Sequence, residues 1–538
     1  MRLLILILLS ISLSENCMCQ SWARNYFPGQ SSIPQSMSVC LDKGLLIGGV
    51  LYNSTGRRFG YVMKTNVNGY ELWHKLIGSM TYTSGLWDVK QTSDGGYIMC
   101  GSSRKNTSNG DTFFAKTDPC LNIEWCRQYA SSCNNIDLGQ EVFELDNGYV
   151  MMVAQFGCDI ENERIWLFRL DSSGTLLWEN YFGQTDTLIT NEISQGLTTH
   201  ADGRYYISGS CWYPEAGSTT LYHEHPFIIK VDSTGIAEWE LPWKDIPGSS
   251  ILFRGEAFQS ILDNKGTIYS CGRHYATAAL PPYGDRPVLL KTDSAGNELA
   301  YKDLKDSTTL GLATTIDWFA DSTIAVGAGW VTLGGMSTNA VVKIDWNGNV
   351  LNTKDIFDND YTFQDAVVTA DNKLILVAGP YINNMYNTYA WKLNSNLEYD
   401  SIYTQPLVYD SLCPYPITSD TIPLDCEIVG LDEPLQNPET GRLKVFPNPA
   451  FNQLHIEIPD KLKSGKQSPM FTITTIYHQW RSASLEIYNL FGERLYSGPI
   501  RQDDRTLDLD VSSWPRGMYV VRLVYNKNTV ASEKVVLE

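Results

Sequence analysis

Positive charge is scarce in this chain. Its 538 residues include 41 Lys and Arg against 60 Asp and Glu, which gives a formal net charge of −19 and a sequence pI near 4.8. A nucleic-acid partner requires a basic face that displaces counterions from the phosphates. The charge balance therefore argues against nucleic acid as a partner.

Histidine is also rare, with seven residues, and this limits the supply of general bases and metal ligands. The sequence has no Gly-x-Ser-x-Gly turn, no His-Glu-x-x-His and no phosphate-binding loop. His223 and His225 form the one His-x-His pair, and on a strand both rings would share a face, as a metal site needs. Two ligands do not complete a site, and Pro226 suggests that a strand starts only after them. We therefore expect no cofactor and keep this pair as weak metal candidates.

Long hydrophobic runs are missing, apart from one near the start. Arg2 precedes the apolar run Leu3–Leu9, and a polar stretch then leads to a small-residue site at residues 17–19. This is the pattern of a signal peptide over residues 1–19. The run is too short for a membrane anchor, and a lipoprotein through Cys17 or Cys19 fits poorly. No other segment is apolar enough to cross a bilayer, so we expect no transmembrane span in the mature chain.

Cysteine is present in an even number, twelve in all and ten after the leader. An exported chain of this kind is expected to form disulfides, although spacing alone does not determine which cysteines pair. We predict a bond between Cys413 and Cys426, which lie in one short polar segment. Cys100 and Cys271 occupy equivalent positions of a repeat and read as buried thiols. One further local pair is expected among three neighbours: Cys120, Cys126 and Cys133.

A repeated hairpin dominates the remaining sequence. In residues 227–240 an apolar strand ends on Lys230, an Asp/Gly turn follows at Asp232, and Trp239 comes four residues after the turn glycine. Two landmarks each occur seven times at a spacing of 49 to 61 residues. The first is an Asp before an apolar strand: Asp42, Asp94, Asp146, Asp202, Asp263, Asp321 and Asp371. The second is the basic residue of the hairpin: Lys64, Lys116, Arg169, Lys230, Lys291, Lys343 and Lys392.

This period suits four short antiparallel strands and their turns. One four-stranded meander cannot cover both its faces, whereas seven arranged radially bury them against one another. We therefore predict an all-β chain with a seven-bladed β-propeller over residues 34–405. A sandwich array would need longer units and a β-helix much shorter ones. The later units lack the hairpin tryptophan and use Tyr301, Leu351 or Tyr399 in its place. The tryptophans expected to fill the gaps between blades are Trp73, Trp125, Trp178 and Trp239.

The repeat resembles those of bacterial propellers with Asp-x-x-Gly-x-x-x-Trp units, including quinoprotein dehydrogenases. The residues that carry the resemblance are the hairpin motifs that start at Asp171 and Asp232. The resemblance implies a propeller fold only, because the quinone and calcium ligands of those enzymes have no counterpart here. The repeated hairpin aspartates are interpreted as turn residues that accept backbone N–H bonds: Asp118, Asp171, Asp232, Asp293 and Asp345.

Two further segments follow the repeats. Residues 406–440 hold six prolines and no periodic apolar pattern, which predicts an extended linker. Residues 441–538 alternate apolar and polar positions in short runs, such as Leu454 and Ile456, which predicts a small immunoglobulin-like β-sandwich.

The last segment resembles the type A C-terminal sorting domain of proteins exported by the type IX secretion system of Bacteroidetes-type bacteria. The resemblance covers residues 441–538, with an insertion over residues 460–483. It implies recognition by the type IX secretion machinery, removal of the domain, and release or attachment of the rest at the outer membrane. The residues that carry the three motifs are Pro447, Asn448, Pro449, Gly492, Gly517 and Tyr519.

Three functions remain open for the exported propeller. It could bind a glycan or protein partner, with the aromatic side chains of Trp212, Tyr213 and Tyr222 stacking on sugar rings. It could be a hydrolase or lyase on polysaccharide with its site at the mouth of the central channel, which clustered acids and bases of perturbed pKa would favour. It could also be a scaffold. The sequence favours a binding protein over an enzyme and assigns no catalytic residue.

Overall fold

The computed structural model describes residues 22–538 with these gaps: 79–81, 105–109, 131–135, 160–161, 183–189, 215–221, 243–254, 277–283, 307–308, 332–336, 360–361, 431–442, 458–482, 490–493, 501–505 and 526–527. The predicted signal peptide, residues 1–19, lies outside these ranges. The chain divides into a first unit of residues 1–128 and 133–428, and a second unit of residues 129–132 and 429–538. Each unit has its own core.

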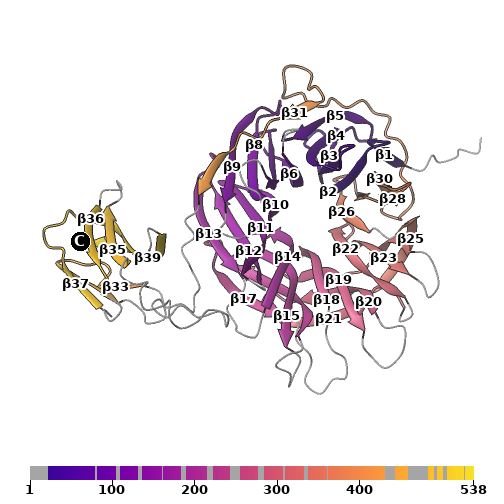
Figure 1. The fold of residues 1–538 in the computed structure, drawn as a ribbon. Helices are drawn as coiled ribbons and strands as arrows, with labels where there is room; N and C mark the ends of the chain where they lie inside the picture. The colour runs from indigo at the N-terminus through magenta and orange to yellow at the C-terminus, as the bar shows by residue number, and fades with distance from the viewer. Residues whose placement is uncertain are drawn as a thin grey trace, which may run out of the picture. The chain divides into compact units, whose positions relative to one another are not determined.

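Within the described residues, the first unit contains a ring of seven sheets, here called blades, each with four antiparallel strands (Figure 1). Two of these sheets gain a fifth strand from a later segment. Blade 1 comprises β2 (Ser31–Val39), β3 (Leu45–Tyr52), β4 (Arg58–Thr65) and β5 (Glu71–Ile77). Blade 2 comprises β6 (Ser84–Gln91), β7 (Tyr97–Ser103), β8 (Asp111–Thr117) and β9 (Ile123–Ala130). Blade 3 comprises β10 (Asp137–Leu145), β11 (Gly148–Asp159), β12 (Asn162–Leu170) and β13 (Leu176–Phe182). Blade 4 comprises β14 (Thr190–Thr199), β15 (Tyr205–Pro214), β16 (Tyr222–Val231) and β17 (Ala237–Pro242).

The remaining blades follow the same order, except at the end of the ring. Blade 5 comprises β18 (Gly255–Leu262), β19 (Ile268–Ala276), β20 (Gly284–Thr292) and β21 (Glu298–Asp303). Blade 6 comprises β22 (Leu310–Trp318), β23 (Ile324–Val331), β24 (Ser337–Ile344) and β25 (Val350–Asp358). Blade 7 comprises β26 (Phe363–Val368), β27 (Lys373–Ala378), β30 (Thr388–Asn394) and β1 (Ala23–Tyr26), and a small hairpin of β28 (Tyr381–Ile382) and β29 (Met385–Tyr386) lies beside it in sequence. The predicted all-β propeller is confirmed, and the seven sheets match the seven copies of each landmark.

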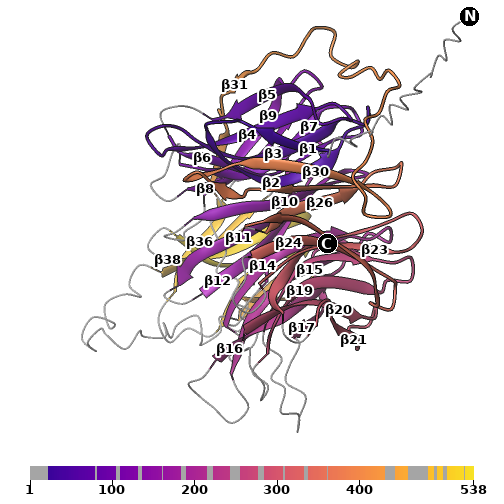
Figure 2. The same ribbon diagram turned by 90° about the vertical axis from the view of Figure 1, so that its right-hand side faces the viewer.

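Blade 7 draws on both ends of the ring. Its fourth strand is β1, which pairs antiparallel with β30 and lies beside it in Figures 1 and 2. The innermost strand of blade 1, β2, packs against β26 of blade 7. The ring is therefore closed by main-chain pairing of a segment that precedes residue 34, where the sequence repeat begins.

The two landmarks meet across the sheet in blades 1, 2 and 6. The ammonium of Lys64 contacts Asp42 at 2.6 Å, Lys116 contacts Asp94 at 2.9 Å, and Lys343 contacts Asp321 at 3.0 Å. The same aspartates also hold their turns, since Asp42 accepts the N–H of Gly44. The ammonium of Lys64 is fully buried, so its carboxylate partners offset its desolvation.

The predicted turn role of the hairpin aspartates is confirmed in all five cases. In each turn, one carboxylate oxygen accepts backbone N–H groups two and four residues onward, at 2.8 to 3.0 Å. These bonds favour the ionised form of the carboxyl. The serine hydroxyl and backbone donors around Asp171 hold its pKa below the usual range, and the donors of Asn297 do the same for the pKa of Asp293.

The predicted packing of the hairpin tryptophans between blades is also observed. Trp73 meets Tyr97 of blade 2 with ring centroids 5.9 Å apart, and Trp125 meets Tyr149 of blade 3 at 5.8 Å. Trp73 is 2% exposed. Such contacts bury large aromatic area where neighbouring sheets diverge.

The tryptophan ring packs directly over the turn glycine of the next blade, where a side chain would clash with it. Gly174 has φ +78°, and a Cβ there would lie 2.6 Å from the ring of Trp125 in the preceding blade. Gly69 stands in the same relation to Trp22, which immediately precedes β1. Trp22 is therefore the interblade tryptophan of blade 7, supplied from the N-terminal side of the chain.

Residues 401–428, here called the strap, run along the outside of blades 1 and 2. Within the strap, β31 (Asp420–Ile422) pairs parallel with β5, beside which it lies in Figures 1 and 2. At its end, β32 (Glu427–Gly430) joins the edge of β9. The carboxylate of Asp410 accepts a bond from the indole of Trp73 at 3.0 Å and contacts the ammonium of Lys64 at 2.5 Å.

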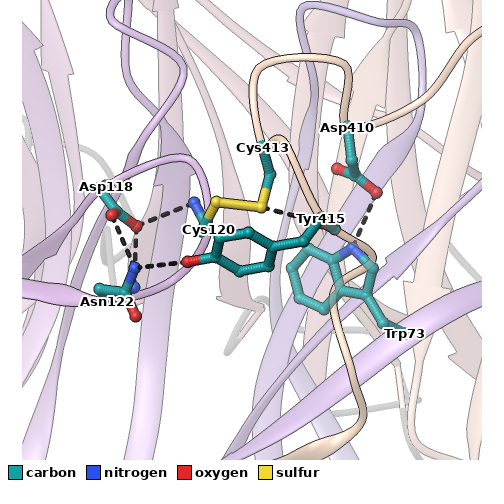
Figure 3. The surroundings of a disulfide bond; sticks show 7 residues. All are labelled: Trp73, Asp118, Cys120, Asn122, Asp410, Cys413 and Tyr415. Atoms are coloured by element: carbon teal, nitrogen blue, oxygen red, sulfur yellow. Dashed lines mark hydrogen bonds between the residues drawn. A yellow bond between two sulfur atoms is a disulfide. The ribbon is translucent and has the colours of Figure 1, made fainter.

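Two disulfides hold the strap to blade 2 and correct the predicted pairing. Cys120 bonds to Cys413 and Cys126 bonds to Cys426, across separations of 293 and 300 residues. Figure 3 shows the first bond, with Tyr415 hydrogen-bonded to Asn122 beside it. The predicted Cys413–Cys426 bond is wrong, because the strap brings distant cysteines together. The predicted local pair among Cys120, Cys126 and Cys133 is also wrong, because Cys120 and Cys126 both bond to the strap. Cys133 lies outside the described residues.

The second unit is a pair of sheets around one core. One sheet comprises β33 (Lys444–Phe446), β34 (Gln453–Glu457) and β37 (Thr506–Asp510). The other comprises β35 (Ala483–Asn489), β36 (Arg494–Pro499), β38 (Gly517–Tyr525) and β39 (Asn528–Leu537). Buried residues of both sheets, among them Ile456, Ile487 and Val521, form a single cluster. The immunoglobulin-like topology stays a prediction.

In the part of the chain that the structure describes, no helix is long and apolar enough to span a membrane.

Candidate functional site

Every innermost strand of the propeller carries a β-bulge at the same level. The register with the second strand skips Gln35 in blade 1, Trp87 in blade 2, Gln140 in blade 3 and Gln195 in blade 4. In blades 5 to 7 the skipped residues are Phe258 with Gln259, Thr314, and Gln364. A bulged residue leaves the regular alternation of a strand, and its side chain is aimed separately from its neighbours.

These bulged residues line one cavity of about 550 Å³. Because residues from all seven innermost strands line it, the cavity is the central channel of the propeller. Its wall combines amide and hydroxyl groups with three aromatic rings, from Trp87, Phe258 and Phe363, and it also includes charged side chains. The five glutamines of the wall are Gln35, Gln140, Gln195, Gln259 and Gln364.

The glutamine side chains of the wall differ in their hydrogen-bond partners. The side-chain nitrogen of Gln259 donates to Asp365 at 3.4 Å, and its oxygen faces the N–H of Ile316. Gln35 and Gln195 have no hydrogen-bond partner for their side chains within the described ranges. Each is only partly buried. These two amides therefore offer donors and acceptors to the contents of the channel.

A second ring of side chains lies directly below the bulges and ties each blade to the next. The carboxylate of Asp88 accepts the N–H of Val142 at 3.0 Å, and Glu141 accepts that of Leu197 at 2.7 Å. The hydroxyl of Ser36 and the amide of Gln259 serve in the same way for blades 2 and 6. These bonds bridge neighbouring innermost strands, so the residues that bear them also have a structural role.

Asp365 makes the corresponding bond at the seam of the ring. Its carboxylate accepts the N–H of Met37 at 2.7 Å, which connects blade 7 to blade 1. Because β2 and β26 come from opposite ends of the repeat, this bond joins residues 328 positions apart in sequence.

Charged groups gather in a deeper part of the channel, a cavity of about 240 Å³. It is lined by Asp88, Lys90, Glu141 and Asp365 from blades 2, 3 and 7. The ammonium of Lys90 contacts Asp88 at 2.6 Å and donates to the backbone oxygen of Val142 at 2.8 Å. Asp317 of blade 6 also lines the cavity, so four carboxyl groups share it with one ammonium.

Burial raises the pKa of three of these carboxyl groups, among them Asp317. Desolvation raises the pKa of Glu141 to about 8, against the opposing charge of Lys90. Desolvation likewise raises the pKa of Asp365 to about 6, although its bond from Met37 acts the other way. Near neutral pH the wall therefore contains a carboxyl that holds its proton beside carboxylates and an ammonium. The cluster of perturbed groups that would favour an enzyme is present, but its members also hold the blades together.

A cluster of ion pairs borders the cavity of about 550 Å³. The guanidinium of Arg273 contacts Glu256 at 2.9 Å, Asp285 at 2.8 Å and Glu224 at 3.0 Å. Both Glu256 and Arg273 line the cavity. Burial, together with the neighbouring Glu256, raises the pKa of Glu224 to about 8. One guanidinium thereby fixes three acidic groups from blades 4 and 5.

The predicted His-x-His pair lies inside β16, not in the connection before it. The backbone of His225 pairs with Cys211 and that of Pro226 with Ser210, so the strand starts before the proline and its predicted start is wrong. His225 is buried, and the side chain of His223 lies outside the description. Among the described residues, no group of three His, Cys, Asp or Glu is placed to hold a metal ion. The metal role of the pair stays a prediction.

The predicted stacking aromatics belong to the paired arms of β15 and β16. The backbone of Trp212 pairs with Glu224, Tyr213 pairs with His223, and Tyr222 pairs with Pro214. The side chains of these three aromatics lie outside the description, so their part in glycan binding stays a prediction.

The predicted sorting residues lie in the second unit. Asn448 follows β33, where its amide donates to the backbone oxygen of Lys534 at 2.9 Å and accepts the N–H of Val536 at 3.0 Å. Pro447 and Pro449 flank it. Tyr519 is buried on β38, and its hydroxyl donates to the oxygen of Pro515 at 2.6 Å. Gly517 starts β38 with φ +150°, and Gly492 lies outside the described residues.

The sequence analysis did not find the channel wall, although a pattern for it exists. In five blades the bulged residue stands seven positions before the first landmark, as Gln35 does before Asp42 and Gln364 before Asp371. Gln195, Thr314 and Trp87 follow the same spacing. A polar residue at a fixed distance from a structural landmark was the available indication.

Comparison with protein families gives one match. Residues 444–538 match the family model described as "Secretion system C-terminal sorting domain". This domain indicates a secreted or cell-surface protein that the type IX secretion machinery handles. A comparison with curated proteins finds no match.

Solved structures similar to this chain include propellers and polysaccharide-acting enzymes. A polysaccharide lyase of family PL25, an ulvan lyase, is 9% identical with a TM-score of 0.43, covering 68% of this chain and 95% of that one. An α-L-arabinanase from Penicillium chrysogenum is 11% identical with a TM-score of 0.37, covering 61% and 96%. The β-propeller domain of the Trilobed protease from Pyrococcus furiosus is 10% identical with a TM-score of 0.38, covering 67% and 93%. No residue role is transferred at these values.

Proposed function

We propose that this protein is an exported propeller, secreted or held at the cell surface, that binds a glycan in its central channel. The observation that carries the proposal is the ring of bulges, which places amides and two aromatic rings around a cavity of about 550 Å³. A volume of this order is that of a small-molecule site. The export route rests separately on the sorting domain.

The chemistry of the wall supports a glycan over a protein partner in the channel. A stable protein interface needs roughly 800 Å² on each side, which a closed channel does not present. Sugar hydroxyls need both donors and acceptors, and an uncharged amide supplies both in one side chain. Trp87 and Phe258 add flat apolar area at low cost in side-chain entropy.

The test is binding by the full chain to a panel of neutral and acidic polysaccharides, measured by thermal shift and then by calorimetry. A ligand that binds the folded state raises the melting temperature by mass action. Replacing both Gln195 and Gln364 by Ala should weaken binding about tenfold or more, since each lost hydrogen bond contributes about 0.5–1.5 kcal/mol.

The matched control is Gln405→Ala, which removes an exposed amide from the strap, outside the cavity. Affinity should be unchanged in the control. Equal affinity of the channel variant and the control for every ligand that binds would reject the channel as the site.

The second candidate is a hydrolase or lyase that acts on polysaccharide in the same channel. It is favoured by Glu141, whose raised pKa of about 8 keeps a proton available for a leaving group at neutral pH. Its carboxyl also accepts the N–H of Leu197, which is the competing structural explanation. Release of new reducing ends or unsaturated products in the binding panel, abolished by Glu141→Gln while affinity persists, would select the enzyme.

A further inference from the structure

A groove of about 420 Å³ lies between blades 5 and 6, at the turns that follow their innermost strands. Four aromatic residues line it: Tyr269, Trp318, Phe319 and Trp346. Asn264, Lys265 and Ser322 add polar groups from the two turns. None of these residues lines either part of the central channel, so the groove is a separate feature.

Trp346 is the unusual member of this set. It occupies the second position of the hairpin turn that starts at Asp345, and its side chain is 57% exposed. The equivalent position in other blades holds small or compact residues: Val67, Pro119, Ser172, Ser233, Ser294 and Ser395. A tight turn of this kind therefore does not need an indole for its own folding.

The fold uses only the backbone of this position. The carbonyl of Trp346 accepts a bond from Lys291 of blade 5 at 3.1 Å. The carbonyl of Ser294 accepts one from Lys230 at 3.0 Å, and that of Ser395 accepts one from Lys343 at 2.9 Å. Serine thus performs the interblade task elsewhere, and the exposed indole is additional to it.

The neighbours of Trp346 hold the groove in shape. The ammonium of Lys291 lies 5.0 Å from the ring centroids of both Tyr269 and Trp346. Tyr269 meets Trp318 edge-on at 5.1 Å, and the indole nitrogen of Trp318 donates to the backbone oxygen of Leu262. Tyr269 and Phe319 are each 2% exposed. The floor is therefore built from packed rings, with one exposed ring at its edge.

We propose that this groove is a second carbohydrate site, in which a pyranose ring stacks on Trp346. A flat exposed indole buries a large area against a sugar ring with little loss of side-chain freedom. Asn264, Lys265 and Ser322 supply hydrogen bonds to hydroxyl groups, as an orienting polar set does in a ligand site. The class of ligand is the one proposed for the channel, but the residues are different, so either site can fail alone.

The test uses the full chain and four soluble probes, the hexaoses of glucose, xylose, mannose and galacturonic acid, followed by calorimetry. Trp346→Ser converts the turn to the residue found in other blades and keeps the carbonyl that Lys291 uses. We expect at least one probe to bind, Trp346→Ser to weaken it tenfold or more, and Trp346→Phe to retain most of the affinity. Stronger binding of the galacturonic acid probe would assign a role to Lys265.

Ile236→Ser is the matched control, because it removes a 63% exposed apolar side chain from a hairpin turn of blade 4. It should bind the probe as the unchanged chain does. The proposal is overturned if no probe binds at 5 mM, or if Trp346→Ser binds as tightly as the control. A channel variant with Gln195→Ala and Gln364→Ala should retain binding in the groove, and loss there instead would move the site to the channel.

Discussion

At the scale of single residues, Glu141 couples the channel to pH. Its pKa is about 8 in the fold because burial disfavours the charged carboxylate, with Lys90 opposing and Asp88 reinforcing this shift. An unfolded glutamate titrates near 4.3. Between these values the native state binds more protons than the unfolded state, so this group lowers stability as pH rises. We expect the Glu141 carboxyl to lower the free energy of unfolding by about 1–3 kcal/mol between pH 5 and pH 8. This is less than the full pKa shift would give, because the side chain reaches the channel and is partly screened by solvent.

The measurement is urea unfolding of the full chain and of Glu141→Gln at both pH values. The amide can still accept the N–H of Leu197, so the variant should lose less stability than the unchanged chain as pH rises. Only the difference between the two proteins is informative, because Asp365 and Glu224 also have raised pKa values. The control is Glu398→Gln, which replaces an exposed carboxyl. If Glu141→Gln loses as much unfolding free energy between pH 5 and pH 8 as the unchanged chain and the control, Glu141 does not titrate in this range.

At the scale of elements, two disulfides attach the strap to blade 2 and contribute to the stability of the fold. Each bond joins residues about 300 positions apart. In the chain-entropy model, closing a loop of this size raises the free energy of the unfolded chain by about 5 kcal/mol. The two bonds close overlapping loops, so their contributions are not additive. We expect replacement of both Cys413 and Cys426 by Ser to lower the free energy of unfolding by about 2–5 kcal/mol.

Reductant should lower the melting temperature of the unchanged chain and leave the double variant unaffected. Peptide mapping without reduction should recover Cys120 linked to Cys413 and Cys126 linked to Cys426. The strap has other contacts, such as Asp410 with Trp73 and β31 with β5, so the propeller should stay folded in the variant. Recovery of a Cys413–Cys426 peptide would contradict the observed pairing.

At the scale of the whole molecule, stability depends on closing the ring. The seam between blades 7 and 1 is held by β1 on β30, by Asp365 on Met37, and by Trp22 packed over Gly69. Trp22 is 1% exposed. Trp22→Ala should therefore cost about 3–5 kcal/mol, as loss of a buried tryptophan does elsewhere.

The measurement is the free energy of unfolding in urea, with Trp346→Ser as the control that removes an exposed tryptophan. The control should lose less than about 1 kcal/mol, because its indole is largely in solvent. If Trp22→Ala unfolds no earlier than the control, the N-terminal strand does not hold the ring closed.

The sequence by itself determined the local units. The hairpin of residues 227–240 was predicted as strand, turn and strand, and β16 and β17 flank that turn, because alternation and Asp/Gly turns act over neighbouring positions. The landmarks also predicted seven blades, and Asp42 and Lys64 meet within one sheet. The second unit was recognised from motifs such as Asn448 and Tyr519, whose bonds lie within that unit.

Only the tertiary structure decided what distant segments do to one another. The placement of β1 in blade 7, the bond of Cys120 to Cys413 and the groove at Trp346 all join residues far apart in sequence. The channel is the clearest case, because each bulge is a property of one strand, whereas the cavity exists only when seven strands converge. Local periodicity fixes which face of a strand is buried, but the partners across a blade interface are set by the closure of the ring.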